Sequence, residues 1–430
     1  MNSPATAATH PPCRLLVADQ VAGAVHLLSL PDGRTTARVQ GRHLAEHAGF
    51  LALPGDRTAF VDDRAGELVV LAPFADEPVG SVGQVGSMWS AVPMRLVESA
   101  TAVAVPAEHL AGDPSGRRLA VSTGLGRNSE AWSDLLTVVD LAAPGGPSAV
   151  RVRTRTGEPG VTVLGSDDPR VVLRHREPGV LAAYRHSELL AAPPACPPVE
   201  PYATLPLPGD GHGDAQDPLH QRLFAATGEG VHRARIAPDG GLVAEEPLDW
   251  GGPGRGYYLR LDPVRRTLWS CVRGGPPAPD AWPEWTNHAW WHHLDSGRTG
   301  RLDLGPGLVF RLAVAARRVA YARVHPDGDE LILLDAADPA VTARIPLPAM
   351  DGAPKPGGTP WDGVQRRAIA ASPGGPLVAV TRGGHGEIHL VDSERPDRQE
   401  VLTVPTPLDE GGHLALMVRG DGAHGDPVGR

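Results

Sequence analysis

Residues 110–121 read LAGDPSGRRLAV, and residues 135–140 read LLTVVD. Together these segments form a sequence motif of three expected strands. The first is apolar and is followed by Asp-Pro, the second begins with Arg, and the third ends in Asp. Glycine and proline separate the short apolar runs, as expected for turns between strands. The motif therefore predicts antiparallel strands that are joined by tight connections.

The second strand of this motif recurs eight times along the chain. Its copies are Leu15–Asp19, Thr58–Asp62, Arg118–Ser122, Arg170–Leu173, Arg222–Ala226, Thr267–Cys271, Arg318–Ala322 and Leu377–Thr381. A third strand follows each copy, at Ala24–Leu30, Glu67–Leu71, Leu135–Asp140, Val180–Tyr184, Gly230–Ile236, Ala289–Asp295, Glu330–Asp335 and Glu387–Asp392. A repeat of roughly fifty residues with several strands per copy predicts a β-propeller.

The two ends of the chain complement each other. No strand precedes the first copy, whereas His413–Val418 forms a spare strand near the C-terminus, and pairing the two would close the ring. We expect an all-β chain with a single β-propeller over residues 14–420, a disordered segment at 1–13 and a flexible tail at 421–430. Eight blades are favoured and seven are the alternative, because the copy around Val161–Tyr184 is degenerate.

Two stretches carry a resemblance to known proteins. Residues 114–121 read PSGRRLAV and residues 383–392 read GGHGEIHLVD. Both resemble repeats of YVTN-type and quinoprotein amine dehydrogenase-like propellers. The resemblance implies the propeller fold and no particular activity, because it rests on turn and core residues.

The overall composition limits the kinds of partner and the cellular compartment that we expect for this protein. A net charge of −10 and a pI near 6.0 oppose a general role on nucleic acid or on anionic membranes. Cys13, Cys196 and Cys271 lie far apart and form no CxxC spacing, which argues against disulfides and a thiolate zinc site. No signal peptide, membrane span or nucleotide-binding motif is evident. We therefore expect a cytoplasmic protein without a nucleotide cofactor.

Four histidines occupy equivalent positions in the repeat, just before the strand that precedes the second strand. They are His47, His109, His212 and His413. Convergence on the axis would make a site for a divalent transition metal such as Fe, Cu, Zn or Ni. The alternative is that each histidine ties the turn of its own blade to the next blade. Glycines on both sides of His212 favour it as the exception, because they allow another group to approach closely.

Residues 282–293 read WPEWTNHAWWHH and follow a proline-rich insertion at 274–280. We expect Trp282 and Trp285 to shape a substrate pocket, with Glu284 and His288 available beside His212 for proton transfer. The alternative is that Trp290 and Trp291 pack between blades. A further set, Arg255, Tyr257, Arg366 and Arg367, occupies the repeat position of the histidines. It indicates either an anion-binding site or an ordinary solvated rim.

These features favour an intracellular enzyme that binds a small organic substrate at the channel mouth, as a metal-dependent oxidoreductase or lyase, within specialised metabolism. The alternative is a non-catalytic propeller that uses its rim as a scaffold for a protein partner. A third interpretation, an electron-accepting dehydrogenase subunit, would require export and a partner with a redox cofactor.

Overall fold

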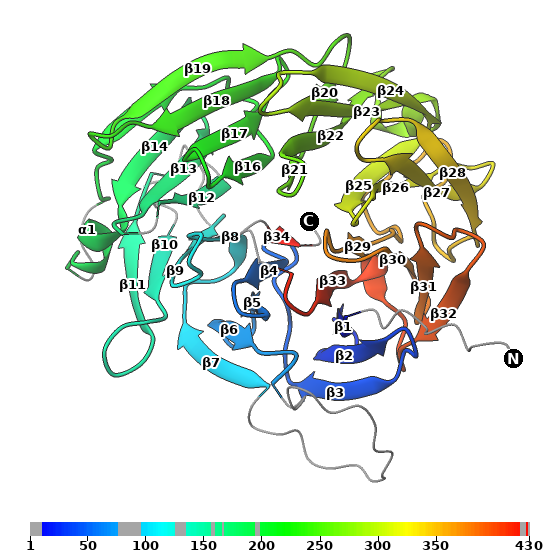
Figure 1. The fold of residues 1–430 in the computed structure, drawn as a ribbon, viewed down its shortest axis with the longest axis horizontal. Helices are drawn as coiled ribbons and strands as arrows, with labels where there is room; N and C mark the ends of the chain where they lie inside the picture. Colours follow the sequence, from blue (N-terminus) through cyan, green and yellow to red (C-terminus); the bar gives the residue numbers. More distant parts are fainter. Residues whose placement is uncertain are drawn as a thin grey trace, which may run out of the picture.

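Eight small antiparallel sheets form a ring around a central axis in the computed structural model (Figure 1). The structure describes residues 11–75, 96–124, 135–155, 160–165, 167–193, 198–421 and 427–428. The predicted all-β propeller with eight blades is confirmed, and the seven-bladed alternative falls away. Cys196 and most of the two predicted terminal segments lie outside the described residues.

Each blade has four main strands, counted outward from the axis, and we number the blades 1 to 8 along the chain. The innermost strands are β33 (His413–Val418), β4 (Phe50–Leu53), β8 (Ala107–Gly112), β12 (Gly160–Leu164), β16 (Asp214–Asp217), β20 (Arg255–Gly256) with β21 (Arg260–Asp262), β25 (Leu308–Val314) and β29 (Ile369–Ala371). The second strands are β1 (Cys13–Asp19), β5 (Arg57–Asp62), β9 (Arg118–Thr123), β13 (Arg170–Arg176), β17 (Arg222–Ala226), β22 (Thr267–Gly274), β26 (Arg318–Val324) and β30 (Leu377–Arg382).

The third strands coincide closely with the predicted ones. They are β2 (Ala24–Leu30), β6 (Glu67–Leu71), β10 (Leu135–Asp140), β14 (Gly179–Arg185), β18 (Val231–Ile236), β23 (Thr286–His293), β27 (Asp329–Asp335) and β31 (Glu387–Asp392). The outer strands are β3 (Thr35–Gln40), β7 (Val97–Ala102), β11 (Ser148–Arg153), β15 (Ala203–Pro206), β19 (Leu242–Leu248), β24 (Thr299–Pro306), β28 (Val341–Leu347) and β32 (Gln399–Thr403).

The ring closes within blade 1, as the sequence predicts. β33 supplies the innermost strand and pairs antiparallel with β1, from Cys13 opposite Val418 to Ala18 opposite His413. The last strand, β34 (Pro427–Val428), pairs with β4 of blade 2. Blade 1 therefore combines strands from both ends of the chain.

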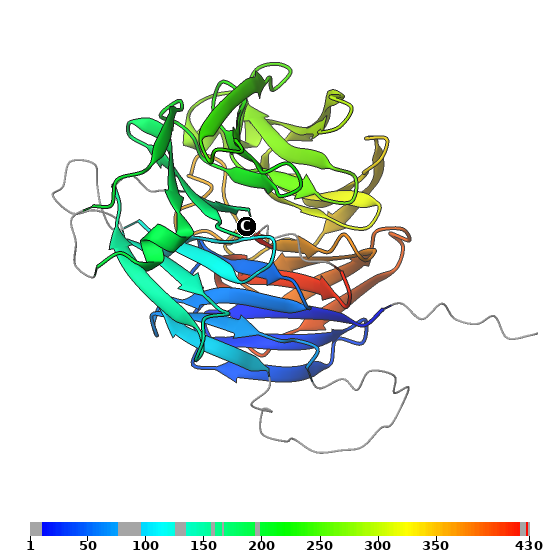
Figure 2. The same cartoon turned by 60° about the vertical axis from the view of Figure 1, so that its left-hand side comes forward.

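Apolar residues of the inner strands stabilise the ring at every blade interface. Eight hydrophobic clusters lie between the eight pairs of neighbouring blades, whose sheets face one another around the ring (Figure 2). The seven residues of β1 are all buried, because a second strand packs both faces against neighbouring blades. The outer strand β7 instead alternates half-buried and exposed residues. A continuous apolar run therefore marks a second strand, which explains why the repeat is clearest there.

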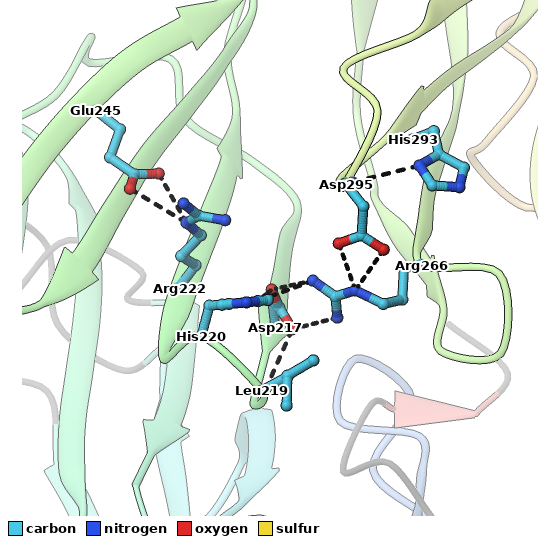
Figure 3. Close-up of polar contacts among 8 residues, drawn as sticks. All are labelled: Asp217, Leu219, His220, Arg222, Glu245, Arg266, His293 and Asp295. Atoms are coloured by element: carbon cyan, nitrogen blue, oxygen red, sulfur yellow. Dashed lines mark hydrogen bonds and ion pairs between the residues drawn. The ribbon is translucent and has the colours of Figure 1, made fainter.

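Asp217, which ends the innermost strand β16, links its turn to the neighbouring blade (Figure 3). Its carboxylate is fully buried and accepts two hydrogen bonds of 3.0 Å from Arg266 in the next blade. The Nε of Arg266 also donates to Asp295, at 2.8 Å. Although burial opposes the shift, hydrogen bonds from Arg266 and His220 lower the pKa of Asp217. These hydrogen bonds therefore stabilise the interface between blade 5 and blade 6.

In the described segments, helical structure is limited to short connections. They are α1 (His186–Leu190) and two 3-10 turns at Pro279–Glu284 and Asp409–Gly411. In the part of the chain that the structure describes, no helix is long and apolar enough to cross a membrane.

Candidate functional site

A cavity of about 1090 Å³ lies at the end of the ring where the innermost strands begin and the second strands end. Side chains from blades 2 to 7, and from the connection that leads into blade 8, line it. Cavities of this size suit small organic ligands, and such sites are common where several blades meet. The location agrees with the expected channel-mouth pocket.

Blade 6 and the connection that leads into blade 8 form a cage of aromatic rings around a guanidinium. The guanidinium of Arg273, at the end of β22, lies 4.1 Å from the ring centroid of Tyr257 and 4.3 Å from that of Trp285. The ring of Trp361 lies 5.4 Å away and stacks on Trp285, with centroids 5.3 Å apart. We call these four residues the Arg273 cage. Stacked rings fix the plane of the guanidinium and leave its N–H edge for a ligand.

Arg255 lies directly opposite Arg273 in the pairing of β20 with β22. Its guanidinium is 4.5 Å from the centroid of Tyr257 and forms an ion pair of 3.1 Å with Asp210. Within the described part of the chain, no carboxylate forms an ion pair with Arg273. Two like charges at facing strand positions are unfavourable. An anionic ligand at Arg273 would offset that repulsion.

A second group of arginines comes from two innermost strands and from the connection that leads into blade 8. Arg311 is on β25, Arg260 is on β21, and Arg366 precedes β29. The guanidiniums of Arg311 and Arg366 lie 5.8 and 5.2 Å from the ring centroid of Phe310. Burial, together with the charges of Arg260 and Arg366, lowers the pKa of Arg311 to about 10. We call these three residues the Arg311 cluster.

Blade 4 completes the basic lining with Arg174 and Arg176. Arg174 is nearly buried and forms an ion pair of 2.6 Å with Asp214, while a second nitrogen donates to the carbonyl of Gly211 at 2.7 Å. Among the described residues, seven arginines thus line the cavity, against three carboxylates, Glu46, Glu108 and Asp214. The cavity is basic although the whole chain is acidic. Such a focused positive field attracts anions.

His212 faces the cavity beside these arginines, and its imidazole packs edge-to-face on Tyr257 with centroids 5.6 Å apart. Burial, together with Arg174 and Arg176, lowers its pKa to about 4, so the ring is neutral at pH 7. Of the three predicted catalytic residues, His212 alone lines this cavity. The close approach expected at its flanking glycines is made by the chain itself, since a Cβ on Gly213 would lie 2.3 Å from the Cα of Tyr258.

The other predicted metal ligands do not converge as a set of four. His47 and His109 line the cavity with His212, but His413 is buried at the start of β33, outside the cavity lining. His47 of blade 2 forms an ion pair of 2.7 Å with Glu108 of blade 3, which matches the inter-blade tie considered as the alternative. Among the described residues, no three His, Cys, Asp or Glu side chains are grouped so that they could hold a metal. A bound metal stays a prediction, which metal analysis of the purified protein would test.

The tryptophan-rich segment is divided between the cavity and the core. Trp285 lines the cavity and donates to the carbonyl of Pro276 at 2.8 Å, whereas Trp282 is fully buried behind it. Glu284 is exposed, and the Nδ1 of His288 lies 2.9 Å from a guanidinium nitrogen of Arg301. Neither side chain is part of the cavity lining. The structure therefore separates these two predicted acid-base residues from the cavity. On β23, Trp290 packs between blades against Trp250, with centroids 5.0 Å apart.

Arg366 and Arg367 are adjacent but differ in their surroundings. Arg366 reaches the cavity, donates to the carbonyl of Trp361 and pairs with Glu410 at 3.1 Å. Arg367 is buried and pairs with Asp329 at 2.7 Å, so it is neither a solvated rim residue nor a cavity residue. Of the four residues at this repeat position, Arg255, Tyr257 and Arg366 line the cavity.

Several cavity residues were missed by the sequence prediction, above all Arg174, Arg273 and Arg311. In blades 4 and 6, the second strand was expected to end at Leu173 and at Cys271. In the structure, β13 continues to Arg176 and β22 continues to Gly274. An arginine that follows a buried second strand is the signal, because strands of this kind end at the cavity. Arg311 has no comparable signal, since it interrupts an otherwise apolar innermost strand.

Comparison with known proteins supports the fold. No family model matches the chain, and no curated protein matches it. Among solved structures, apo AztD from Citrobacter koseri has a TM-score of 0.64 at 13% identity, covering 96% of this chain and 99% of that one. The dihydro-heme d1 dehydrogenase NirN, in complex with DHE, has a TM-score of 0.59 at 14% identity, covering 98% and 78%. The predicted resemblance to propeller superfamilies is thus confirmed as a likeness of fold.

Proposed function

We propose that this propeller binds a small organic anion with a flat apolar part in its cavity. The observation that carries the proposal is the Arg273 cage, in which a guanidinium without a carboxylate partner among the described residues lies over three aromatic rings. A carboxylate or phosphate would accept hydrogen bonds from the edge of this guanidinium. Rings that already stack on Arg273 also offer apolar surface to the body of the ligand.

A calorimetric titration with a matched pair of compounds tests this proposal. Naphthoate carries one carboxylate on a flat apolar body, and naphthamide is its neutral counterpart. We expect naphthoate to bind and naphthamide to bind at least about tenfold more weakly, because charge-assisted hydrogen bonds contribute roughly 1.5–3 kcal/mol. Equal binding of the two compounds, or no binding of either, would reject the proposal.

The position of His212 predicts how this binding depends on pH. Its imidazole is neutral in the free protein above about pH 4. A bound anion nearby would favour the protonated ring and raise its pKa, so the complex would take up a proton that the free protein does not hold. We therefore expect the affinity for naphthoate to rise as the pH falls from 7 to 5. Calorimetry at three pH values should show a flatter profile for His212→Asn, and an unchanged slope in that variant would exclude His212 as the source.

An enzymatic role in the cytoplasm belongs to the same proposal. Of the predicted catalytic residues, His212 is the one that lines the cavity in which the anion would bind. Proton transfer to or from the ligand would therefore be the role of this side chain. A scaffold function is the second candidate considered. It receives less support, because the exposed large hydrophobic residues of the described chain are spread over five blades rather than gathered in one patch.

A further inference from the structure

His212 and Arg273 lie against the same aromatic ring of the cavity, that of Tyr257. The imidazole packs edge-to-face on this ring with centroids 5.6 Å apart, and the guanidinium of Arg273 lies 4.1 Å from the ring centroid. Both side chains line the cavity. A flat molecule whose acidic group binds Arg273 therefore also comes close to the imidazole of His212.

The backbone at Tyr257 determines which hydrogen bonds this imidazole can make. One ring nitrogen of His212 donates a hydrogen bond to the carbonyl of Tyr257, and the pKa of about 4 keeps the ring neutral at pH 7. The chain is packed tightly here, since a Cβ on Gly213 would lie 2.7 Å from the same carbonyl oxygen. A neutral imidazole has a single N–H, so the second nitrogen can only accept a hydrogen bond. His212 therefore offers an acceptor to a ligand in the cavity.

The charges around the imidazole indicate which kind of donor suits this acceptor. Three arginines oppose its protonation, Arg174 and Arg176 on β13 and Arg255 on β20. They do so although Arg174 and Arg255 each have a carboxylate partner. The same positive field disfavours an ammonium group beside the ring, but it stabilises a hydroxyl oxygen that becomes more negative as it shares its proton with the imidazole. A hydroxyl therefore suits His212 better than an amine.

Resting on the proposed function, we infer that the natural ligand is a flat hydroxy acid, with a hydroxyl group on its apolar body in addition to the acidic group. The acidic group would bind Arg273, and the hydroxyl would donate to the second nitrogen of His212. In this arrangement the imidazole can take a proton from the ligand and has none to give, which assigns His212 the role of a general base. A simple acid would leave the acceptor nitrogen without a donor from the ligand.

Calorimetry at pH 7 with matched probes tests the inference. The probes are the hydroxynaphthoates whose hydroxyl is on the ring that lacks the carboxylate, and the methoxynaphthoates in which a methyl group replaces the hydroxyl proton. We expect the best hydroxynaphthoate to bind about fivefold more tightly than naphthoate and than its own methoxy counterpart, because one neutral hydrogen bond contributes a gain of this size.

The outcomes separate this inference from the proposed function. If every hydroxynaphthoate binds no better than naphthoate, or if the methoxy counterpart binds as tightly as the best hydroxynaphthoate, the inference is wrong although the proposed function stands. If neither naphthoate nor any of the substituted probes binds, both are wrong.

Variants assign the gain in affinity to the imidazole. His212→Phe keeps a flat ring beside Tyr257 but has no acceptor nitrogen, so naphthoate and the best hydroxynaphthoate should bind this variant with equal affinity. His212→Leu also lacks the acceptor and serves as a second variant if the phenylalanine variant does not fold. His293→Phe, at the end of β23 that is far from the cavity, is the matched control and should retain the fivefold difference. A difference that persists in both His212 variants would overturn the inference.

Discussion

Replacing Arg273 with glutamine should weaken the binding of naphthoate by tenfold to a hundredfold, the largest effect that we expect of any single change in the cavity. The guanidinium is the central group of the Arg273 cage, and the described chain offers it no carboxylate that could compensate its charge. Loss of a bidentate, charge-assisted contact costs about 1.5–3 kcal/mol. Calorimetry on the wild type and Arg273→Gln measures the ratio directly.

The same substitution should leave the stability of the fold almost unchanged. Arg273 is half-buried at the cavity, so glutamine leaves no buried carboxylate without its partner. Arg273→Lys is the conservative variant and should lose less affinity, because it keeps the charge but not the planar fork or the stacking. An Arg273→Gln protein that binds naphthoate like the wild type would refute the role of this residue. A loss of binding accompanied by a large drop in melting temperature would attribute the effect to folding instead.

Arg266→Gln should produce the largest loss of stability, of about 3 kcal/mol, without a direct effect on the cavity. The substitution leaves the carboxylate of Asp217 fully buried and without its bidentate partner, and removal of one member of a buried ion pair costs about 3–5 kcal/mol. We place the expected value at the lower end, because His220 also contacts Asp217 at 3.1 Å. Chemical denaturation with urea gives the free energy of unfolding of both proteins.

Asp295→Asn provides the matched control for this prediction. Asp295 binds the same guanidinium at 2.8 Å, but its side chain is half exposed, and exposed ion pairs contribute about 0–1 kcal/mol. We therefore expect a small change in the control and a large one in Arg266→Gln. Similar losses in the two variants would mean that burial does not set the strength of this inter-blade network.

The fold could be predicted from the sequence because a propeller repeats one local pattern. All eight predicted second strands are present, and the closing strand at His413–Val418 pairs with β1 as expected. The largest shift is in blade 6, where the third strand was predicted at Ala289–Asp295 and β23 covers Thr286–His293. The proline-rich insertion before it breaks the spacing of the repeat, and the apolar run WW within the strand is compatible with either register.

The candidate site could be predicted only in part. Equivalent repeat positions identified His47, His109, His212, Arg255 and Tyr257, which do line one cavity. The roles depend on neighbours that no spacing reveals: Glu108 of the next blade pairs with His47, and Asp329 draws Arg367 into the core. Trp361, which contributes one ring of the Arg273 cage, is nearly ninety residues away from Arg273 in the sequence. A contact between residues so far apart forms only in the folded ring, and no local pattern predicts it.

A crystal structure of the protein soaked with naphthoate would show directly where the anion binds. We predict that the carboxylate lies within about 3 Å of the guanidinium nitrogens of Arg273, with the rings against Trp285 and Trp361. Density for the compound at the outer rim of the blades, or a cavity that stays free of it at saturating concentration, would contradict the proposed function.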